Sequence, residues 1–439
     1  MIKLFDDWIV SNEFNDKPFL MMGKGPSLEL HSKIDRTKYI SLGLNHVPQK
    51  HKVDVGHAID YEVIKEAGPD LVKNAEYLLM PWYPNLGFRP HTKNLDELCK
   101  EDPVLNRFKK GNRLLTYNRA GTPPCPLGGR PINLIYFSGD SVFQLLSLLG
   151  QPVVYSIGID GGKEYNADFK RLTPLENGRE TFDDQFKVIN HVSDLVGSKM
   201  VRLAELEPIR VFVGSQYEQR VPAMVLKSSI MEHTHHPVFF NILSDFNITH
   251  KTPDDPKNRP RTPFSFQRFM IPSLTTGKAF YLDSDMQVFG DMAELLDIDF
   301  GDNEVLACSG MDKYGHRKGS EYAFLMMDCD KIDWNLDKIV EDLDAGKMNY
   351  EELMFDFKIA KVGHKISPDW NSLDHYEEGV TKLLHYTDMA RQPWRVPNHP
   401  HEDQWKKGLL KTLDKKQVDH HLYADHKLRG FIRDVLVSK

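Results

Sequence analysis

The sequence predicts an α/β protein made of two domains. Its 439 residues are more than one ordinary hydrophobic core holds, since domains usually run to about 100–200 residues. Segments 18–30 and 209–233 each show an apolar strand, a turn and the start of a helix. Strands that alternate with helices favour parallel sheets covered on both faces. We expect domains at 1–204 and 205–439, because the regular pattern of a helix at 180–196 gives way there to mixed sequence.

The composition narrows the classes of function. The chain is 40% hydrophobic and 27% charged with a net charge of -7, so nothing points to nucleic acid as a general partner. No apolar run reaches the roughly 18–20 residues of a membrane span, and the acidic N-terminus is unlike a signal peptide. The cysteines, which form no Cys-x-x-Cys pair, are Cys99, Cys125, Cys308 and Cys329. We therefore expect a cytoplasmic protein rather than a disulfide framework or a zinc site.

In the first domain, glycine-rich or polar turns follow the predicted strands. Gly23–Ser27 follows the first apolar strand, and glycine permits a tight turn with close backbone approach. A second strand at 39–47 ends near Asn45. The helix expected next after Gly23–Ser27 can hold an anion at its N-terminus. In 135–162 a glycine turn opens a helix, and the strand after it ends at Asp160. These turns predict a ligand site at one edge of the sheet.

These segments together resemble a Rossmann-like family that includes bacterial family 42 sialyltransferases and the hydroxymethylpterin diphosphokinase group, over roughly residues 18–170. The resemblance implies a nucleotide site, which in the sialyltransferases takes a CMP-sugar without a metal. His46 and His57 are the candidates for that family's catalytic histidine. The matching nucleotide-binding positions are Gly23, Gly25, Pro26, Ser27, Asn45, Ser138, Gly139, Ser141, Gly158 and Asp160. A degenerate domain that packs, binds or scaffolds is the alternative.

In the second domain, two acids interrupt an apolar stretch, AFYLDSDMQVF at 279–289. Residues 280–282 suit a buried strand, and ligands bind at the carboxyl ends of strands in open α/β sheets. Buried carboxylates without a partner are costly, and a divalent cation such as Mg²⁺ or Mn²⁺ offsets the cost. Side chains alternate in an extended segment, so we expect Asp283 and Asp285 to point to the same side. A simple polar turn is the alternative.

The passage around these acids resembles glycosyltransferases of the GT-A fold, in particular family 8. The matching positions are Arg268, Ile271, Pro272, Asp283, Asp285, Gly290, Asp291 and Leu295. The family's late histidine motif resembles KLLHYTDMARQPWR at 382–395, where His385 would be the third metal ligand. The chain departs from that motif, because Asp388 replaces a glycine, Arg391 replaces a lysine, and Gln392 is an extra residue before the Pro-Trp pair.

The two resemblances together imply an α/β fold with two Rossmann-like nucleotide-binding domains, the second of GT-A type with a mixed, mainly parallel sheet. They imply a UDP- or GDP-sugar donor bound through Mn²⁺ or Mg²⁺. The residues that would hold this donor are Val213, Gly214, Ser215, Arg268, Asp283, Ser284, Trp370 and Asn371. Asp374 and Arg391 are the catalytic candidates, the arginine because a guanidinium suits the charge that builds on a leaving diphosphate. An ordinary polar loop with a packed tryptophan is the alternative for 367–379.

We therefore expect a glycosyltransferase of surface polysaccharide synthesis with two nucleotide-sugar sites and a glycan or lipid-linked acceptor. Three alternatives stay open: a metal-dependent phosphohydrolase, a nucleotidyl- or pyrophosphotransferase, and a non-enzymatic glycan- or nucleotide-binding module. The basic tail at 406–439 suits either a packed amphipathic helix or contact with the inner face of an anionic membrane.

Overall fold

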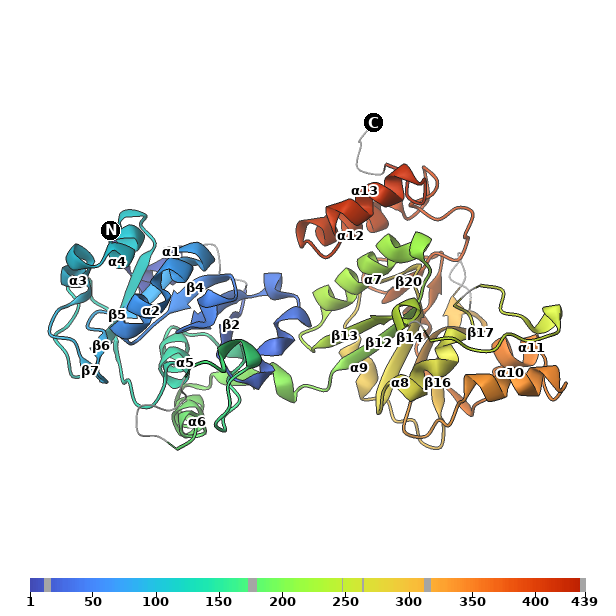
Figure 1. Ribbon diagram of the computed structural model, residues 1–439, viewed down its shortest axis with the longest axis horizontal. Coiled ribbons are helices and arrows are strands. Elements are labelled where there is room, and N and C mark those ends of the chain that lie inside the picture. Colours follow the sequence, from blue (N-terminus) through green and yellow to red (C-terminus); the bar gives the residue numbers. More distant parts are fainter. Residues whose placement is uncertain (12–16, 173–179, 247, 263, 312–316, 435–439) are drawn as a thin grey trace. The chain divides into compact units, whose positions relative to one another are not determined.

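The computed structural model describes residues 1–11, 17–172, 180–246, 248–262, 264–311 and 317–434 (Figure 1). The chain divides into two compact units, Met1–Leu206 and Glu207–Lys439, where the sequence predicts the boundary two residues earlier. Each unit has its own sheet and its own hydrophobic core. None of the described helices combines the length and the apolar character that a membrane span requires.

The first unit is built on a fully parallel sheet. In spatial order its strands are β1 (Ile2–Leu4), β8 (Leu114–Arg119), β5 (Ala75–Pro81), β4 (Val53–His57), β3 (Ile40–Leu44), β2 (Phe19–Met22), β10 (Val153–Ile157) and β11 (Lys199–Arg202), and β9 (Pro131–Ile132) pairs with β8. A two-stranded hairpin, β6 (Asn85–Leu86) and β7 (Arg89–Pro90), lies apart from it. The chain runs outward from β2 to β8 and then returns to place β10 on the other side of β2.

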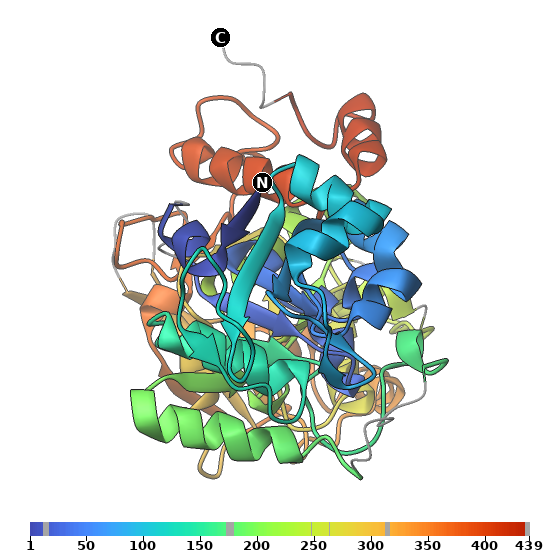
Figure 2. The same cartoon turned by 90° about the vertical axis from the view of Figure 1, so that its left-hand side faces the viewer.

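Helices cover both faces of this sheet, as the alternation of strands and helices predicts (Figures 1 and 2). One core cluster lies under α1 (Phe5–Ser11), α5 (Ser138–Leu148) and α6 (Asp184–Val196). The other lies under α2 (Tyr61–Asn74), α3 (Leu95–Glu101) and α4 (Pro103–Lys110). Neighbouring strand residues such as Leu78 and Leu79 belong to opposite clusters, since side chains alternate along a strand.

The second unit has a mixed sheet in which parallel pairs outnumber antiparallel ones. In spatial order its strands are β13 (Val238–Ile242), β12 (Ile209–Gly214), β14 (Lys278–Asp283), β17 (Arg317–Asp328), β16 (Val305–Met311), β19 (Ser372–Leu373), β20 (Leu383–His385) and β15 (Met286–Val288), and β18 (Val362–Ile366) pairs with β16. Strand β12 lies parallel to both its neighbours, whereas β14 and β17 are antiparallel. The predicted fold class, α/β with a mixed sheet in the second domain, is confirmed.

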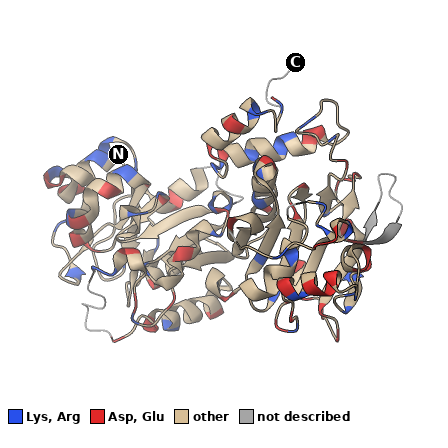
Figure 3. Cartoon of the chain, turned by 45° about the vertical axis from the view of Figure 1, so that its right-hand side comes forward, with Lys and Arg blue, Asp and Glu red and all other residues tan. Residues whose placement is uncertain are grey.

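Two layers of helices enclose this sheet. On one face lie α7 (Arg220–His233) and α9 (Ala293–Leu296), and on the other lie α8 (Ile271–Leu274), α10 (Leu336–Asp344) and α11 (Tyr350–Met354). Figure 3 shows acidic and basic residues interspersed over the helices of each unit, with acids gathered at α10.

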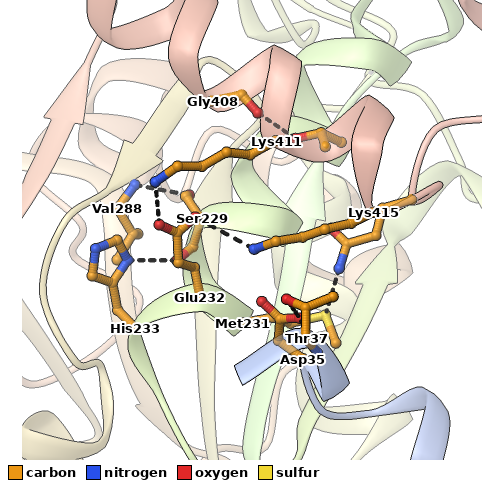
Figure 4. A network of polar contacts seen from close by, with 12 residues as sticks. Asp35, Thr37, Ser229, Met231, Glu232, His233, Val288, Gly408, Lys411 and Lys415 are labelled. Carbon is orange, nitrogen blue, oxygen red and sulfur yellow. Dashed lines mark hydrogen bonds and ion pairs between the residues drawn. The ribbon is translucent and has the colours of Figure 1, made fainter. Parts of the chain in front are cut away.

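The tail packs on the second unit through α12 (Glu402–Asp414) and α13 (His420–Leu428). The indole of Trp405 lies 5.2 Å from that of Trp394 in a shared cluster with α7. Lys411 of α12 and Lys415, which caps the C-terminal end of α12, both pair with Glu232 of α7 (Figure 4). Burial acts to raise the pKa of Glu232, but the two lysines outweigh it and hold the pKa below its usual range. The tail is therefore a packed amphipathic element.

Candidate active site

The site of the second unit lies where β12 and β14 end side by side. Gly214 pairs with Asp283 in the parallel register, and the backbone N–H of Ser284 donates to the carbonyl of Gly214 at 3.2 Å. Val213 is buried in β12, and the hydroxyl of Ser215 donates to the Gln216 carbonyl at 3.2 Å. The Ser284 hydroxyl is buried and donates to Oε1 of Gln219 at 3.1 Å. The backbone predicted to hold the nucleotide therefore adjoins the two acids.

Asp283, Asp285 and His385 converge at this edge. One potential ligand atom from each lies within 4.8 Å of the others. Strand β20 delivers the histidine, because Met286 pairs with His385 in the antiparallel register. Asp283 ends β14 and Asp285 lies in the turn before β15, so the predicted extended Asp-x-Asp segment is wrong as a local description. The turn and the neighbouring strand, rather than side-chain alternation, bring the three groups together.

The electrostatics of the three groups favour a bound cation. Burial raises the pKa of Asp283, Arg268 acts against it, and the nearby charge of Asp285 raises it further. Burial lowers the pKa of His385, but its contact with Asp285, 3.3 Å between Nε2 and Oδ1, outweighs burial and leaves the pKa raised. Nδ1 of His385 is buried with no hydrogen-bond partner among the described residues. Two carboxylates and an imidazole are a donor set that suits Mn²⁺ or Mg²⁺, and the residues fit such an ion.

A buried tyrosine fixes the first acid. The hydroxyl of Tyr281 donates to Oδ1 of Asp283 at 2.6 Å and accepts from the Arg268 guanidinium at 3.1 Å. The same guanidinium donates to the carbonyls of Ser265 and Tyr322, so it supports Asp283 at 3.9 Å rather than facing open solvent. A Cβ on Gly214 would collide with the Tyr281 hydroxyl, which explains why glycine stands there.

The predicted cation of the histidine motif does not reach the site. Arg391 is exposed, and its backbone N–H closes a turn on the carbonyl of Asp388. The extra residue, Gln392, is buried in its place, and its Nε2 donates to Oδ2 of Asp285 at 2.9 Å. The inserted residue thus faces Asp285 while Arg391 is exposed, and the catalytic role of Arg391 stays a prediction.

Asp374 shapes the segment that carries the histidine. Its backbone has φ 52°, its N–H donates to the His385 carbonyl at 2.9 Å, and its carboxylate accepts from the backbone and the hydroxyl of Thr387. Such a left-handed conformation in a non-glycine residue is often a feature of functional sites. The contacts make Asp374 a residue that positions His385.

Trp370 and Asn371, which the sequence predicts to bind the donor, have different surroundings. Trp370 is buried, packs on Phe324 at 6.2 Å and donates from Nε1 to Glu294, so it belongs to the core in this structure, and its contact with the sugar stays a prediction. Asn371 is 0% exposed, and neither side-chain amide atom has a partner among the described residues. A buried amide without partners is costly, so Asn371 stays a candidate for a ligand contact.

The comparison with protein families assigns this segment. Residues 209–351 match the family Glycosyl transferase family 8. This segment of the second unit, from β12 to the start of α11, is therefore similar to family 8 glycosyltransferases. The match covers about a third of the chain and includes Asp283 and Asp285, whereas His385 lies beyond it. A comparison with curated proteins finds no match.

Solved structures similar to this chain are glycosyltransferases at low identity. WbbM, described as bifunctional, is 13% identical over 64% of this chain and 65% of its own, with a TM-score of 0.34. GlyE of Streptococcus pneumoniae is 16% identical over 52% of this chain and 65% of its own, with a TM-score of 0.33. The galactosyltransferase LgtC, solved with donor and acceptor sugar analogs, is 14% identical over 49% and 99%, with a TM-score of 0.36. The chain spans 65% of the length of the first two, and similarity at this level defines no activity.

The first unit has a separate cleft at the point where its strand order reverses. This point lies between β2 and β10, and ligands of open α/β sheets bind at such a position outside the carboxyl ends of the strands. The cleft has a volume of about 660 Å³. The predicted nucleotide-binding residues that line it are Gly23, Gly25, Asn45, Ser138, Gly139, Ser141, Gly158 and Asp160. The structure thus brings together residues that are up to about 140 positions apart in the sequence.

The two turns at this point pack directly on each other. A Cβ on Gly23 would collide with the carbonyl of Gly158, whose φ is +67°, so both positions require glycine. Ser27 does not line the cleft, and it donates from its backbone and its hydroxyl to the carboxylate of Asp160. Pro26 also lies outside the lining, at the start of a short 3₁₀ helix. These two residues build the turn rather than the cleft wall.

The two histidine candidates of the first unit differ in position. His46 lines the cleft, and its Nε2 lies 2.8 Å from Glu66, while Nδ1 is buried without a partner among the described residues. His57 is fully buried at the end of β4, where it contacts the hydroxyl of Tyr117 at 3.0 Å. His46 therefore adjoins the cleft, whereas His57 does not line it, and the catalytic role of either histidine stays a prediction. The resemblance of this unit to family 42 sialyltransferases stays a prediction.

Proposed function

We propose that the second unit transfers a sugar from a nucleoside diphosphate sugar to a glycan or lipid-linked acceptor with the help of Mn²⁺ or Mg²⁺. The observation that supports this most is the convergence of Asp283, Asp285 and His385 within a unit that is similar to family 8 glycosyltransferases over residues 209–351. The donor is a UDP- or GDP-sugar, and the product belongs to a surface polysaccharide.

Each residue of the site has a defined task in this reaction. Asp283, Asp285 and His385 hold the ion, while the Arg268–Tyr281 pair keeps Asp283 oriented. The end of β12, from Val213 to Ser215, adjoins the acids and positions the nucleotide. When bound, the ion neutralises the negative charge that builds on the leaving diphosphate. Asn371 offers a buried donor and acceptor for a hydroxyl of the sugar or the acceptor.

The cleft of the first unit supports a second nucleotide-sugar site, and with it a bifunctional enzyme. Its position at the strand-order reversal and its volume suit a nucleotide. Lys24, Arg119 and Arg171 line it and can attract a phosphate. The ligand that we propose for this cleft is a CMP-sugar, as the resemblance to family 42 sialyltransferases implies.

The four cysteines are free and buried, which suits a reducing, cytoplasmic compartment. Contact of the tail with the inner face of a membrane receives less support, since Lys411 and Lys415 already pair with Glu232.

The test is thermal-shift screening of the intact protein with UDP-, GDP- and CMP-sugars, with and without Mn²⁺, because a ligand of the folded state raises its Tm. We expect a shift with a UDP- or GDP-sugar that requires Mn²⁺ and is lost in Asp285→Asn but kept in Asp297→Asn, a change at an exposed acid. A metal-independent shift with a CMP-sugar that survives Asp285→Asn would support the second site. A nucleotide that binds without any sugar preference would favour a nucleotidyl- or pyrophosphotransferase, and no shift at all would favour a glycan-binding scaffold.

A further inference from the structure

A buried glutamine in the segment between β20 and α12 contacts Asp285, one of the three candidate metal ligands. Gln392 is 1% exposed. Its side-chain Nε2 donates to Oδ2 of Asp285 at 2.9 Å and to the carbonyl of Tyr386 at 3.3 Å. This residue is the extra one in the segment that resembles the family's histidine motif.

The orientation of this amide follows from its partners. Both groups that face Nε2, a carboxylate oxygen and a backbone carbonyl, can only accept hydrogen bonds. A flipped amide would place Oε1 against two oxygens, so the nitrogen must point to Asp285. The oxygen Oε1 is left buried without a partner among the described residues, a cost that the flipped form would not remove.

The two oxygens of the Asp285 carboxylate have different partners. Oδ2 is taken by Gln392, while Oδ1 faces Nε2 of His385 at 3.3 Å. The backbone N–H of Tyr386 also donates to the carbonyl of Asp285 at 2.9 Å. Asp285 is thus held by its backbone carbonyl and by Oδ2, and Oδ1 is the oxygen that faces His385.

Packing keeps the glutamine in place. Pro393 and Trp394 follow it and are buried, and the Trp394 ring lies 5.2 Å from Trp405 of α12 and 5.6 Å from Tyr386. The carboxamide is therefore anchored by the helix that covers α7 and not by a free loop. The carboxamide is neutral, so it orients Asp285 without neutralising the negative charge that attracts the ion. A lysine or arginine at this position would neutralise that charge.

We propose that Gln392 is a positioning residue that makes Asp285 a one-oxygen metal ligand and thereby sets the affinity of the site for Mn²⁺. This inference rests on the proposed function, since it requires that the Asp283, Asp285 and His385 cluster binds the ion. Gln392, the extra residue of the motif, lies next to Asp285, where the sequence predicts the side chain of Arg391.

The test is the dissociation constant for Mn²⁺ of the intact protein, measured by titration calorimetry and by the electron paramagnetic resonance signal of free Mn²⁺. Gln392→Met keeps the shape of the side chain and removes the donor, and we expect it to weaken Mn²⁺ binding about 10- to 100-fold. Gln392→Asn keeps the amide but cannot reach Asp285, and should weaken binding similarly. The matched control is Gln287→Met, because Gln287 is also buried and is bonded to the Tyr386 hydroxyl and the Gln404 carbonyl, but not to a carboxylate.

The control should lower the Tm and leave the dissociation constant for Mn²⁺ within about twofold of the parent. Equal Mn²⁺ affinity in the parent and in both Gln392 variants would overturn the inference and leave the metal site standing. Equal weakening in Gln287→Met and Gln392→Met would also overturn it, since the effect would then be general loss of packing. A parent that binds no Mn²⁺ would contradict the proposed metal site itself, and the inference with it.

Discussion

The hydroxyl of Tyr281 bridges Arg268 and Asp283, with 2.6 Å to the carboxylate and 3.1 Å to the guanidinium. Tyr281→Phe would remove one buried hydrogen bond from the Arg268 guanidinium and one from the Asp283 carboxylate. We expect it to lower the free energy of unfolding by about 1–3 kcal/mol and to weaken Mn²⁺ binding. The control is Tyr423→Phe in the same unit, because the buried Tyr423 hydroxyl has no partner among the described residues. Chemical denaturation compares them, and equal costs for the two variants would contradict the bridge.

Asn371 should show opposite effects on stability and on binding. Its amide is buried and unpartnered among the described residues, so Asn371→Leu is expected to leave the free energy of unfolding unchanged or to raise it by about 1 kcal/mol. The same change should weaken the binding of the nucleotide-sugar donor or of the acceptor sugar, because the hydrogen bonds of the amide are lost. As a contrast, Asn349→Leu removes the side chain that caps α11 and should cost about 1 kcal/mol. A large loss of stability in Asn371→Leu would show that the amide serves the fold and not a ligand.

The closely packed turns of the first unit predict a difference between two glycines. Gly158 has φ +67°, and a Cβ there would collide with the backbone of Gly23, whereas Gly150 has φ +83° with nothing within 4 Å. Gly150→Ala should therefore cost only the conformational strain, about 1–2 kcal/mol. Gly158→Ala should cost more than that and should weaken any ligand of the cleft. Denaturation of the intact protein measures both, and comparable losses would be evidence against the tight approach of the two turns.

The first unit should lose stability in acid because of His57. Complete burial lowers the pKa of His57 to about 3, whereas in the unfolded chain it is about 6.5. Between these values the unfolded state binds a proton that the folded state does not, so the free energy of unfolding falls as the pH falls. His57 alone contributes a slope of up to about 1.4 kcal/mol per pH unit in that window.

His57→Gln removes this titration, so its free energy of unfolding should depend less steeply on pH between about 6 and 4. Labelling of buried thiols with a reagent that reacts in acid separates the units during denaturation, because Cys99 and Cys125 report on the first and Cys308 and Cys329 on the second. Identical pH slopes for the first-unit thiols in parent and variant would exclude His57 as the source.

The strands, the helices and the metal-ligand trio follow largely from local sequence. The apolar run 280–282 and the helix around 221–231 appear in the structure as β14 and α7. Asp283 and Asp285 are separated by one residue, and the resemblance to family 8 predicts that His385 joins them, as the structure shows. In the first unit, glycine turns after strands indicate the cleft for the same reason, since parallel strands end at one edge.

The sequence does not indicate the surroundings of residues whose place depends on long-range packing. The bond between Gln392 and Asp285 joins residues 107 positions apart, and no local pattern indicates it. With one inserted residue in the motif, the side chain of Gln392 faces Asp285 and that of Arg391 is exposed. Trp370 stands in a polar-looking loop, yet its ring packs on Phe324 in the core. Burial of this kind depends on strands that lie elsewhere in the chain.

The most direct measurement is the rate of nucleoside diphosphate release from the donor selected by the thermal-shift screen, in the presence of saturating Mn²⁺ and acceptor. Asp285→Asn is compared with the parent and with Asp297→Asn, the exposed control. We expect Asp285→Asn to lose at least about 100-fold in rate while its folded structure is retained, and Asp297→Asn to match the parent. Turnover of Asp285→Asn within about twofold of the parent would contradict the assignment of Asp285 as a ligand of the ion that holds the donor diphosphate.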